Sequence, residues 1–247
     1  MKVVIIGGVA AGTKVAAKLK RENPEDEIVI YTKGKDISYA GCGLPYYIGG
    51  AIETEGELIV NTPQKFMGLT GTEVYTESEV TAVDPAAKTI QVQGDGARTV
   101  SYDKLVIAVG AESSMPPVEG TSLPGVFTVR TPQDAINARK YAVEKECRRA
   151  VVVGGGFIGL EVAENLMARG ISVTVVDMAS QLMPNIFDPE MADYIRRRLQ
   201  EKGMRILTGT GLKAIGGQDV GMIRWKPERW QRTASRWRMW IRTAGRN

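Results

Sequence analysis

Ala150-Val151-Val152-Val153-Gly154-Gly155-Gly156-Phe157-Ile158-Gly159 sets the expectation for the fold of this 247-residue chain. An apolar, β-branched run leads into glycines at 154, 156 and 159, the spacing of a dinucleotide-binding turn. A helical pattern over 160–166 follows, and a strand-like run over 172–176 ends in Asp177, 18 residues beyond Gly159. An acidic side chain at that point binds ribose hydroxyls. We therefore predict a nucleotide site in which Asp177 favours a free 2′-hydroxyl, hence NAD(H) over NADP(H).

A second, weaker pattern of this kind stands at the start of the chain. A buried-strand run, Lys2-Val3-Val4-Ile5-Ile6, breaks at Gly7-Gly8-Val9-Ala10-Ala11-Gly12, and a helix over 13–21 and a strand over 28–32 complete a β-α-β unit. Valine takes the middle glycine position, and Thr32 stands where an acid normally holds the ribose. Thr32 can still bond a hydroxyl, more weakly than a carboxylate. The alternative is a tight packing turn without a ligand.

Between the two glycine turns lies Ser38-Tyr39-Ala40-Gly41-Cys42-Gly43-Leu44-Pro45-Tyr46-Tyr47. Glycines at 41, 43, 49 and 50 allow close backbone approach to a flat or bulky group, and we interpret Cys42 as a redox-active thiol. The alternative is a buried structural thiol. With no histidine in the chain, the Cys42 thiolate would depend on a helix N-terminus and on a cofactor for stabilisation.

The other elements follow from periodicity and turn residues. We expect antiparallel strands over 73–75, 78–83, 89–93 and 99–100, a buried parallel strand over 103–111, a connection over 112–132, helices over 134–146 and 188–202, and a strand over 205–208.

Composition excludes several classes of function. Two cysteines make no disulfide framework, and the absence of histidine argues against a metal site and against Ser-His catalysis. No run approaches the roughly 20 apolar residues that span a bilayer, so we expect a soluble, cytoplasmic protein. Residues 221–247 carry a net charge of +7 against +4 for the whole chain, which leaves −3 for residues 1–220. The basicity belongs to the tail, and we expect no nucleic-acid partner and no membrane partner.

Together these motifs resemble the pyridine nucleotide-disulfide oxidoreductases, and most closely their single-cysteine branch of coenzyme A-disulfide reductases and related NADH oxidases and peroxidases. The resemblance covers about residues 1–220, and the Cys42 segment is its most specific part. It implies an α/β fold with two Rossmann-like dinucleotide-binding domains, each a three-layer arrangement of parallel sheet and antiparallel β-meander. The implied domains are 1–112 for FAD, 113–145 as connection and linker helix, and 146–220 for part of the NAD(P) domain.

The resemblance also implies roles for individual residues. Phe157 would be the aromatic gate that admits the nicotinamide, Cys42 would be catalytic, and Cys147 structural. Lys18, Arg21 and Ser38 would bind the substrate, with a solvated helix face as the alternative for the first two. The remaining residues would bind the cofactors: Gly7, Gly8, Gly12, Thr32 and Gly110 for FAD, and Gly154, Gly156, Gly159 and Asp177 for NADH.

The implied reaction passes electrons from NAD(P)H, with NADH favoured, through FAD to Cys42. Cys42 would cycle through a mixed disulfide or a sulfenic acid. The peroxidases of this branch keep a histidine where Ala10 stands, so coenzyme A disulfide is the expected oxidant. The alternatives are an NADH oxidase or peroxidase acting on oxygen species, and a non-catalytic nucleotide-binding fragment.

Family members continue beyond this length, so both domains would be incomplete at their C-termini. All four tryptophans lie in the Arg/Trp-rich residues 221–247, where we find no strand or helix period. A tryptophan codon preceded by G reads as valine one base earlier, so we interpret this tail as a frameshifted strand region; a basic-aromatic stripe for nucleic acid is the alternative. The family works as a homodimer, whereas we expect this chain to be monomeric or to aggregate.

Overall fold

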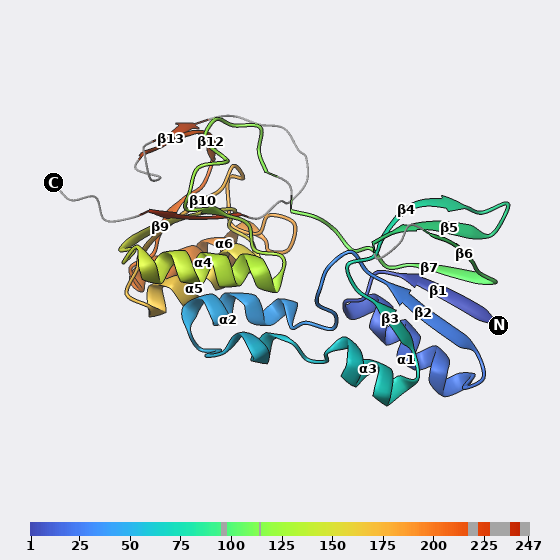
Figure 1. Ribbon diagram of the computed structural model, residues 1–247. Coiled ribbons are helices and arrows are strands. Elements are labelled where there is room, and N and C mark those ends of the chain that lie inside the picture. Colours follow the sequence, from blue (N-terminus) through green and yellow to red (C-terminus); the bar gives the residue numbers. More distant parts are fainter. Residues whose placement is uncertain (95–97, 114, 217–221, 228–237, 243–247) are drawn as a thin grey trace. The chain divides into compact units, whose positions relative to one another are not determined.

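The computed structural model describes residues 1–94, 98–113, 115–216, 222–227 and 238–242, with side chains described as far as residue 216. It consists of two compact units, which Figure 1 shows. Unit 1 comprises Met1–Ala40 and Ile59–Ala111, and unit 2 comprises Gly41–Leu58 and Glu112–Asn247. We predicted the cysteine segment, residues 38–47, as part of the first domain, but its residues 41–47 belong to unit 2.

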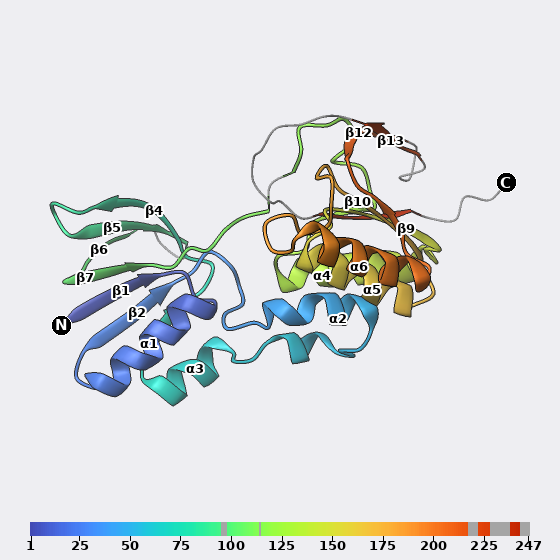
Figure 2. The same cartoon turned by 180° about the vertical axis from the view of Figure 1, so that it is seen from behind.

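Unit 1 is built on a four-stranded parallel sheet in the order β3-β2-β1-β7. Side chains of strand β1 alternate between two cores. Val3 and Ile5 pack with helices α1 and α3, and Val4 and Ile6 pack with a second, antiparallel sheet. Figures 1 and 2 show the two helices on one face and the meander on the other, so this unit has three layers. Its helices and strands are β1 (Lys2–Ile6), α1 (Ala10–Glu22), β2 (Glu27–Tyr31), α3 (Pro63–Thr70), β3 (Glu73–Tyr75), β4 (Glu79–Asp84), β5 (Thr89–Gln93), β6 (Arg98–Ser101) and β7 (Lys104–Ile107).

One strand of unit 1 differs from the prediction. Strands β4, β5 and β6 form the expected antiparallel meander. The prediction was wrong for β3, which pairs in parallel with β2 through Val29↔Glu73, Ile30↔Val74 and Tyr31↔Tyr75. Helix α3 precedes β3 and supplies the crossover that a parallel pair needs. Three residues of alternating pattern could not reveal this, because the helix was not predicted.

Unit 2 contains a five-stranded sheet in the order β11-β10-β9-β14-β8 and a separate antiparallel pair, β12-β13. Strands β9, β10 and β11 are parallel, as predicted, whereas β14 runs antiparallel to both of its neighbours. Its helices and strands are the 3-10 turn η1 (Gly41–Gly43), α2 (Leu44–Gly49), the 3-10 turn η2 (Glu55–Leu58), β8 (Val126–Phe127), α4 (Pro132–Glu144), β9 (Arg149–Val153), α5 (Phe157–Ala168), β10 (Ser172–Val176), α6 (Pro189–Glu201), β11 (Arg205–Leu207), β12 (Thr210–Gly216), β13 (Met222–Pro227) and β14 (Arg238–Arg242).

The main core of unit 2 lies on one face of this sheet. Val152 and Val175 point into it and meet Val162 and Leu166 of α5, together with small residues of α4 such as Ala138. Helix α2 adds Leu44, Tyr47 and Ile48 to the same core. The cysteine segment is thus folded onto the helical face of this nucleotide-type unit.

The tail is partly regular, contrary to the expectation of no strand period. β13 pairs with β12 from Thr210↔Pro227 to Gly216↔Met222, and β14 pairs with β9 and β8. Strand pairing uses backbone groups, so it can form without an alternating side-chain pattern. Residues 217–221, 228–237 and 243–247 lie outside the described parts of the chain, and so do the side chains of all four tryptophans.

Candidate functional site

The first glycine turn joins β1 to α1 in unit 1. Gly7 has φ +106, and a Cβ there would lie 2.2 Å from the carbonyl oxygen of Ala108. A Cβ on Gly12 would lie 1.8 Å from the oxygen of Gly7, and one on Gly8 would lie 3.2 Å from the Thr32 methyl carbon. Glycine is therefore required where the helix packs against its own strand.

Gly110 lies just beyond β7, next to β1 in the sheet, and has φ +70. The predicted FAD residues of unit 1 thus gather at the carboxyl ends of β1, β2 and β7, the edge at which parallel sheets bind nucleotides.

The second turn joins β9 to α5 in unit 2 and repeats this geometry. Gly154 has φ +114, and a Cβ on Gly159 would lie 2.0 Å from the Gly154 oxygen. Gly155 donates its backbone N–H to Oδ2 of Asp177 at 2.6 Å, and Ala179 donates to Oδ1 at 2.7 Å. A carboxylate offers about four lone-pair sites, so about two stay free for ribose hydroxyls.

Both turns leave their helix N-termini without a side-chain cap. Val9 before α1 and Gly156 before α5 make no capping bond, and neither helix has an acidic residue in its first turn. By contrast α3, α4 and α6 are capped by Thr62, Thr131 and Asp188. The first N–H groups of a helix have no intrahelical acceptor, so α1 and α5 keep theirs for an anion such as a pyrophosphate. The two donor sets fit dinucleotides.

Phe157 is the first residue of α5 and is 53% exposed. Its role as the aromatic gate stays a prediction.

Cys42 lies in the turn η1, directly before α2, and its side chain is exposed. The alternative of a buried thiol is therefore wrong for Cys42. It holds for Cys147, where burial raises the thiol pKa to about 11, an effect that the charge of Lys145 opposes only weakly. An exposed thiol can reach an external disulfide, and a buried protonated one cannot.

The predicted substrate residues all belong to unit 1. Lys18 and Arg21 lie on α1, and the Lys18 ammonium pairs with Glu22 at 2.8 Å. Ser38 has φ +48, unusual for a residue with a side chain, and its backbone N–H donates to the oxygen of Gly8. Its hydroxyl accepts a bond from the Asn61 amide at 3.4 Å.

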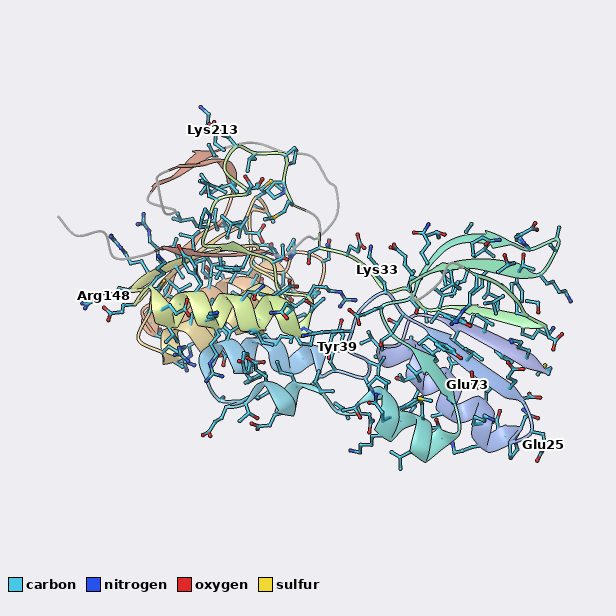
Figure 3. The ribbon with its side chains drawn as sticks, viewed as in Figure 1. Glu25, Lys33, Tyr39, Glu73, Arg148 and Lys213 are labelled. Atoms are coloured by element: carbon cyan, nitrogen blue, oxygen red, sulfur yellow. The ribbon has the colours of Figure 1, made fainter. Side chains whose placement is uncertain are left out.

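Ser38 thus ties the first glycine turn to the start of the cysteine segment. Tyr39, labelled in Figure 3, follows and forms an isolated antiparallel bridge with Ile59.

The described part of the chain contains neither a metal-binding cluster nor a membrane-spanning helix. Within it, no group of three or more His, Cys, Asp or Glu residues could hold a metal ion. Its helices are also too short or too polar to cross a bilayer.

The fold and the two turns define a class: an α/β protein with two glycine turns of the dinucleotide-binding type and an exposed thiol between them. A family model described as pyridine nucleotide-disulphide oxidoreductase matches residues 1–232, and the chain belongs to this family. The match extends into the segment interpreted as a frameshifted tail.

Individual relatives agree with this assignment. An NADH oxidase of Methanocaldococcus jannaschii is 40% identical over 221 residues, which are 89% of this chain and 49% of the relative. A coenzyme A disulfide reductase of Staphylococcus epidermidis is 30% identical over 230 residues, 92% of this chain and 52% of the relative. The crystal structure of reduced Bacillus anthracis CoADR-RHD superposes with a TM-score of 0.87 at 38% identity, covering 91% of this chain and 41% of the other. The chain therefore spans about half the length of these relatives.

One residue that holds helix α2, directly after Cys42, was not predicted from the sequence. Arg139 of α4 donates to the carbonyl oxygens of Tyr47, Ile52 and Glu53. A lone arginine on a helix carries no motif, and only the contact with a segment 86 to 92 residues away reveals it.

Proposed function

We propose that this chain is the nucleotide-binding part of an FAD- and NADH-dependent reductase that passes electrons to a disulfide through Cys42, with coenzyme A disulfide as its substrate. The observation that carries the proposal is the exposed Cys42 in a family whose two nucleotide turns are both formed in this chain. FAD, when bound, supplies the two-electron relay between NADH and the thiol.

The residues of each turn have separate tasks in this proposal. Gly7, Gly8 and Gly12 let the first N–H groups of α1 face the FAD pyrophosphate, and Thr32 and Gly110 line the same strand edge. Gly154, Gly156 and Gly159 let the first N–H groups of α5 face the NADH pyrophosphate. Asp177 accepts bonds from the ribose hydroxyls, and Phe157 covers the nicotinamide. A 2′-phosphate would meet the negative charge of Asp177, which is why NADH is favoured over NADPH.

Cys42 performs the thiol chemistry. Its thiolate attacks one sulfur of coenzyme A disulfide, forming a mixed disulfide with Cys42 and releasing one coenzyme A thiolate. Two electrons that originate from NADH then break the mixed disulfide, regenerating the Cys42 thiolate and releasing the second coenzyme A after protonation. The balance is one NADH, one proton and one disulfide giving NAD⁺ and two thiols. Lys18, Arg21 and Ser38 would hold the nucleotide phosphates of the substrate.

The second candidate is an NADH oxidase or peroxidase, favoured by the name of the M. jannaschii relative. In that case Cys42 would be oxidised to a sulfenic acid and reduced again, with water as product. Ala10 at the start of α1 offers no side chain to donate a proton to a peroxide, so we keep the disulfide as the first choice. A cytoplasmic location and a homodimeric full-length form belong to this proposal.

The test compares three electron acceptors on the FAD-reconstituted chain. We expect NADH to be consumed with coenzyme A disulfide more rapidly than with dioxygen, and Cys42→Ser to abolish only the disulfide activity while ferricyanide reduction persists. A faster reaction with dioxygen would favour the oxidase. NADH binding without turnover of any acceptor would instead identify a nucleotide-binding module.

A further inference from the structure

Helix α2 is short and carries the Cys42 turn at its amino-terminal end. It has six residues, a length of about 9 Å. So short a helix is not stable by itself in water. The turn before it has little support of its own: a Cβ on Gly41 would meet no atom within 4 Å, and Cys42 is exposed. The chain before this turn is anchored at Ser38 and Tyr39. On its other side, the order of the Cys42 turn depends on what holds α2.

One face of α2 is buried in unit 2. Leu44, Tyr47 and Ile48 are at most 6% exposed and pack with α4 and α5. Figures 1 and 2 show α2 beside these two helices from both sides. This apolar contact fixes which face of α2 points inward, but it contains no directional bond.

The directional bonds come from Arg139 on α4. Its Nη1 donates to the carbonyl oxygens of Tyr47 at 3.2 Å, Ile52 at 3.0 Å and Glu53 at 3.1 Å. Its guanidinium carbon lies 4.5 Å from the ring centroid of Tyr47, within cation–π range. One side chain thus binds both the last turn of α2 and the chain that leaves it, where a cation also complements the helix dipole.

Helix α5 closes on the same end of α2. A Cβ on Gly49 would lie 2.5 Å from the Asn165 side-chain oxygen, and a Cβ on Gly50, with φ +90, would lie 2.9 Å from a guanidinium nitrogen of Arg169. The bulky group that these two glycines admit is α5. We call Arg139, Asn165 and Arg169 the α2 clamp.

We propose that Arg139 is the positioning residue for Cys42: by holding the carboxyl-terminal end of α2, it keeps the Cys42 turn at the other end of that helix in a fixed geometry. The inference rests on the proposed function, in which Cys42 must be held where it can both attack a disulfide and receive electrons. The clamp and the Cys42 turn lie at opposite ends of a helix of fewer than two turns, so α2 transmits the constraint as a short rigid element.

The experiment measures both ends of α2 in the full chain. Hydrogen exchange of Gly50, Ala51 and Ile52, whose N–H groups bond to Tyr46 or Tyr47, reports on the clamped end. The line shape of a nitroxide attached to Cys42, in a Cys147→Ala background, reports on the turn.

The variants are Arg139→Ala, Arg139→Lys and the matched control Lys140→Ala. Lys140 is the neighbouring cation on α4, but it is exposed and pairs with Glu144 rather than with α2.

We expect Arg139→Ala to speed exchange at residues 50–52 by about tenfold, the equivalent of one charge-assisted bond, and to mobilise the label on Cys42. Lysine should restore much of the order, because all three contacts come from one nitrogen, whose two N–H groups are shared among three carbonyl oxygens, and an ammonium has three N–H donors. Lys140→Ala should match the parent at both ends.

Three results would overturn the proposal. If Arg139→Ala speeds exchange at residues 50–52 but leaves the nitroxide line shape unchanged, Arg139 only caps the end of α2. If Arg139→Lys restores no order, or if Lys140→Ala has the same effect as Arg139→Ala, Arg139 has no specific role in positioning Cys42. If Arg139→Ala fails to fold, Gly49→Ala presses the same end of α2 away from Asn165 and must mobilise the label. Neither measurement needs electron transfer, so this inference and the proposed function can fail independently.

Discussion

Asp177 offers a quantitative test of the second nucleotide turn, through the isosteric variant Asp177→Asn. Its two carboxylate oxygens each accept one backbone N–H, from Gly155 at 2.6 Å and from Ala179 at 2.7 Å. An amide has a single acceptor oxygen, so in the variant one of these N–H groups faces an NH2 donor. Hydrogen bonds to charged groups contribute about 1.5–3 kcal/mol, and we expect a loss of unfolding free energy of about that size.

The same change weakens nucleotide binding. The variant loses the charge that orients the ribose hydroxyl donors, and we expect NADH to bind about tenfold more weakly, the equivalent of 1.4 kcal/mol. The preference for NADH over NADPH should shrink, because the 2′-phosphate no longer meets a carboxylate. Isothermal titration with each nucleotide, together with a thermal melt, measures both effects.

Asp193→Asn is the matched control. Asp193 is also an aspartate of unit 2, but it lies on α6 and pairs with Arg196 and Arg197 at the surface. Removing such an exposed pair changes stability by at most about 1 kcal/mol, and NADH affinity should not change. An Asp177→Asn protein that melts and binds NADH like the parent would refute the role assigned to this carboxylate.

Gly159→Ala would place a Cβ 2.0 Å from the Gly154 oxygen, so we expect loss of NADH binding with FAD binding retained. Titration with each nucleotide checks this, and an equal loss of both affinities would count against two independent turns. Burial raises the thiol pKa of Cys147 to about 11, so this thiol should stay protonated and unmodified by iodoacetamide at pH 8 while Cys42 is alkylated. Peptide mass spectrometry measures the labelling of each cysteine, and equal labelling would contradict the burial argument. Ile107 is 66% exposed on the edge strand β7, and unpaired apolar edges promote association. Ile107→Lys should therefore reduce the aggregation we expect of this chain, as measured by light scattering after size exclusion. An unchanged aggregated fraction would show that this edge is not responsible.

The parts of the fold predicted from sequence are those with strong local signals. Glycines at a fixed spacing between a β-branched run and a helix define both turns. The bond from the Gly155 N–H to Asp177 was not predicted, although it places this carboxylate beside the second turn. Alternation over 79–101 identified the meander because each strand has one face on a core, with Ile90 and Val92 buried.

The parts that were missed depend on contacts distant in sequence. β3 is only three residues long, and its parallel partner is decided by the α3 crossover. The glycines at 49 and 50 were recognised as sites of close approach, but the partner that approaches, α5, lies more than a hundred residues further along the chain. Arg139 is the same kind of case, because its significance rests on three carbonyl groups that only folding brings to it.

Intact-protein mass spectrometry can follow the one bond on Cys42 that the proposed reaction requires. The chain is first incubated with coenzyme A disulfide, and FAD and NADH are then added without oxygen. We predict one coenzyme A adduct on Cys42, absent from Cys42→Ser, that NADH discharges only when FAD is present. No adduct on Cys42, or an adduct that persists with both FAD and NADH bound, would contradict the claim that Cys42 is the thiol through which this protein passes electrons.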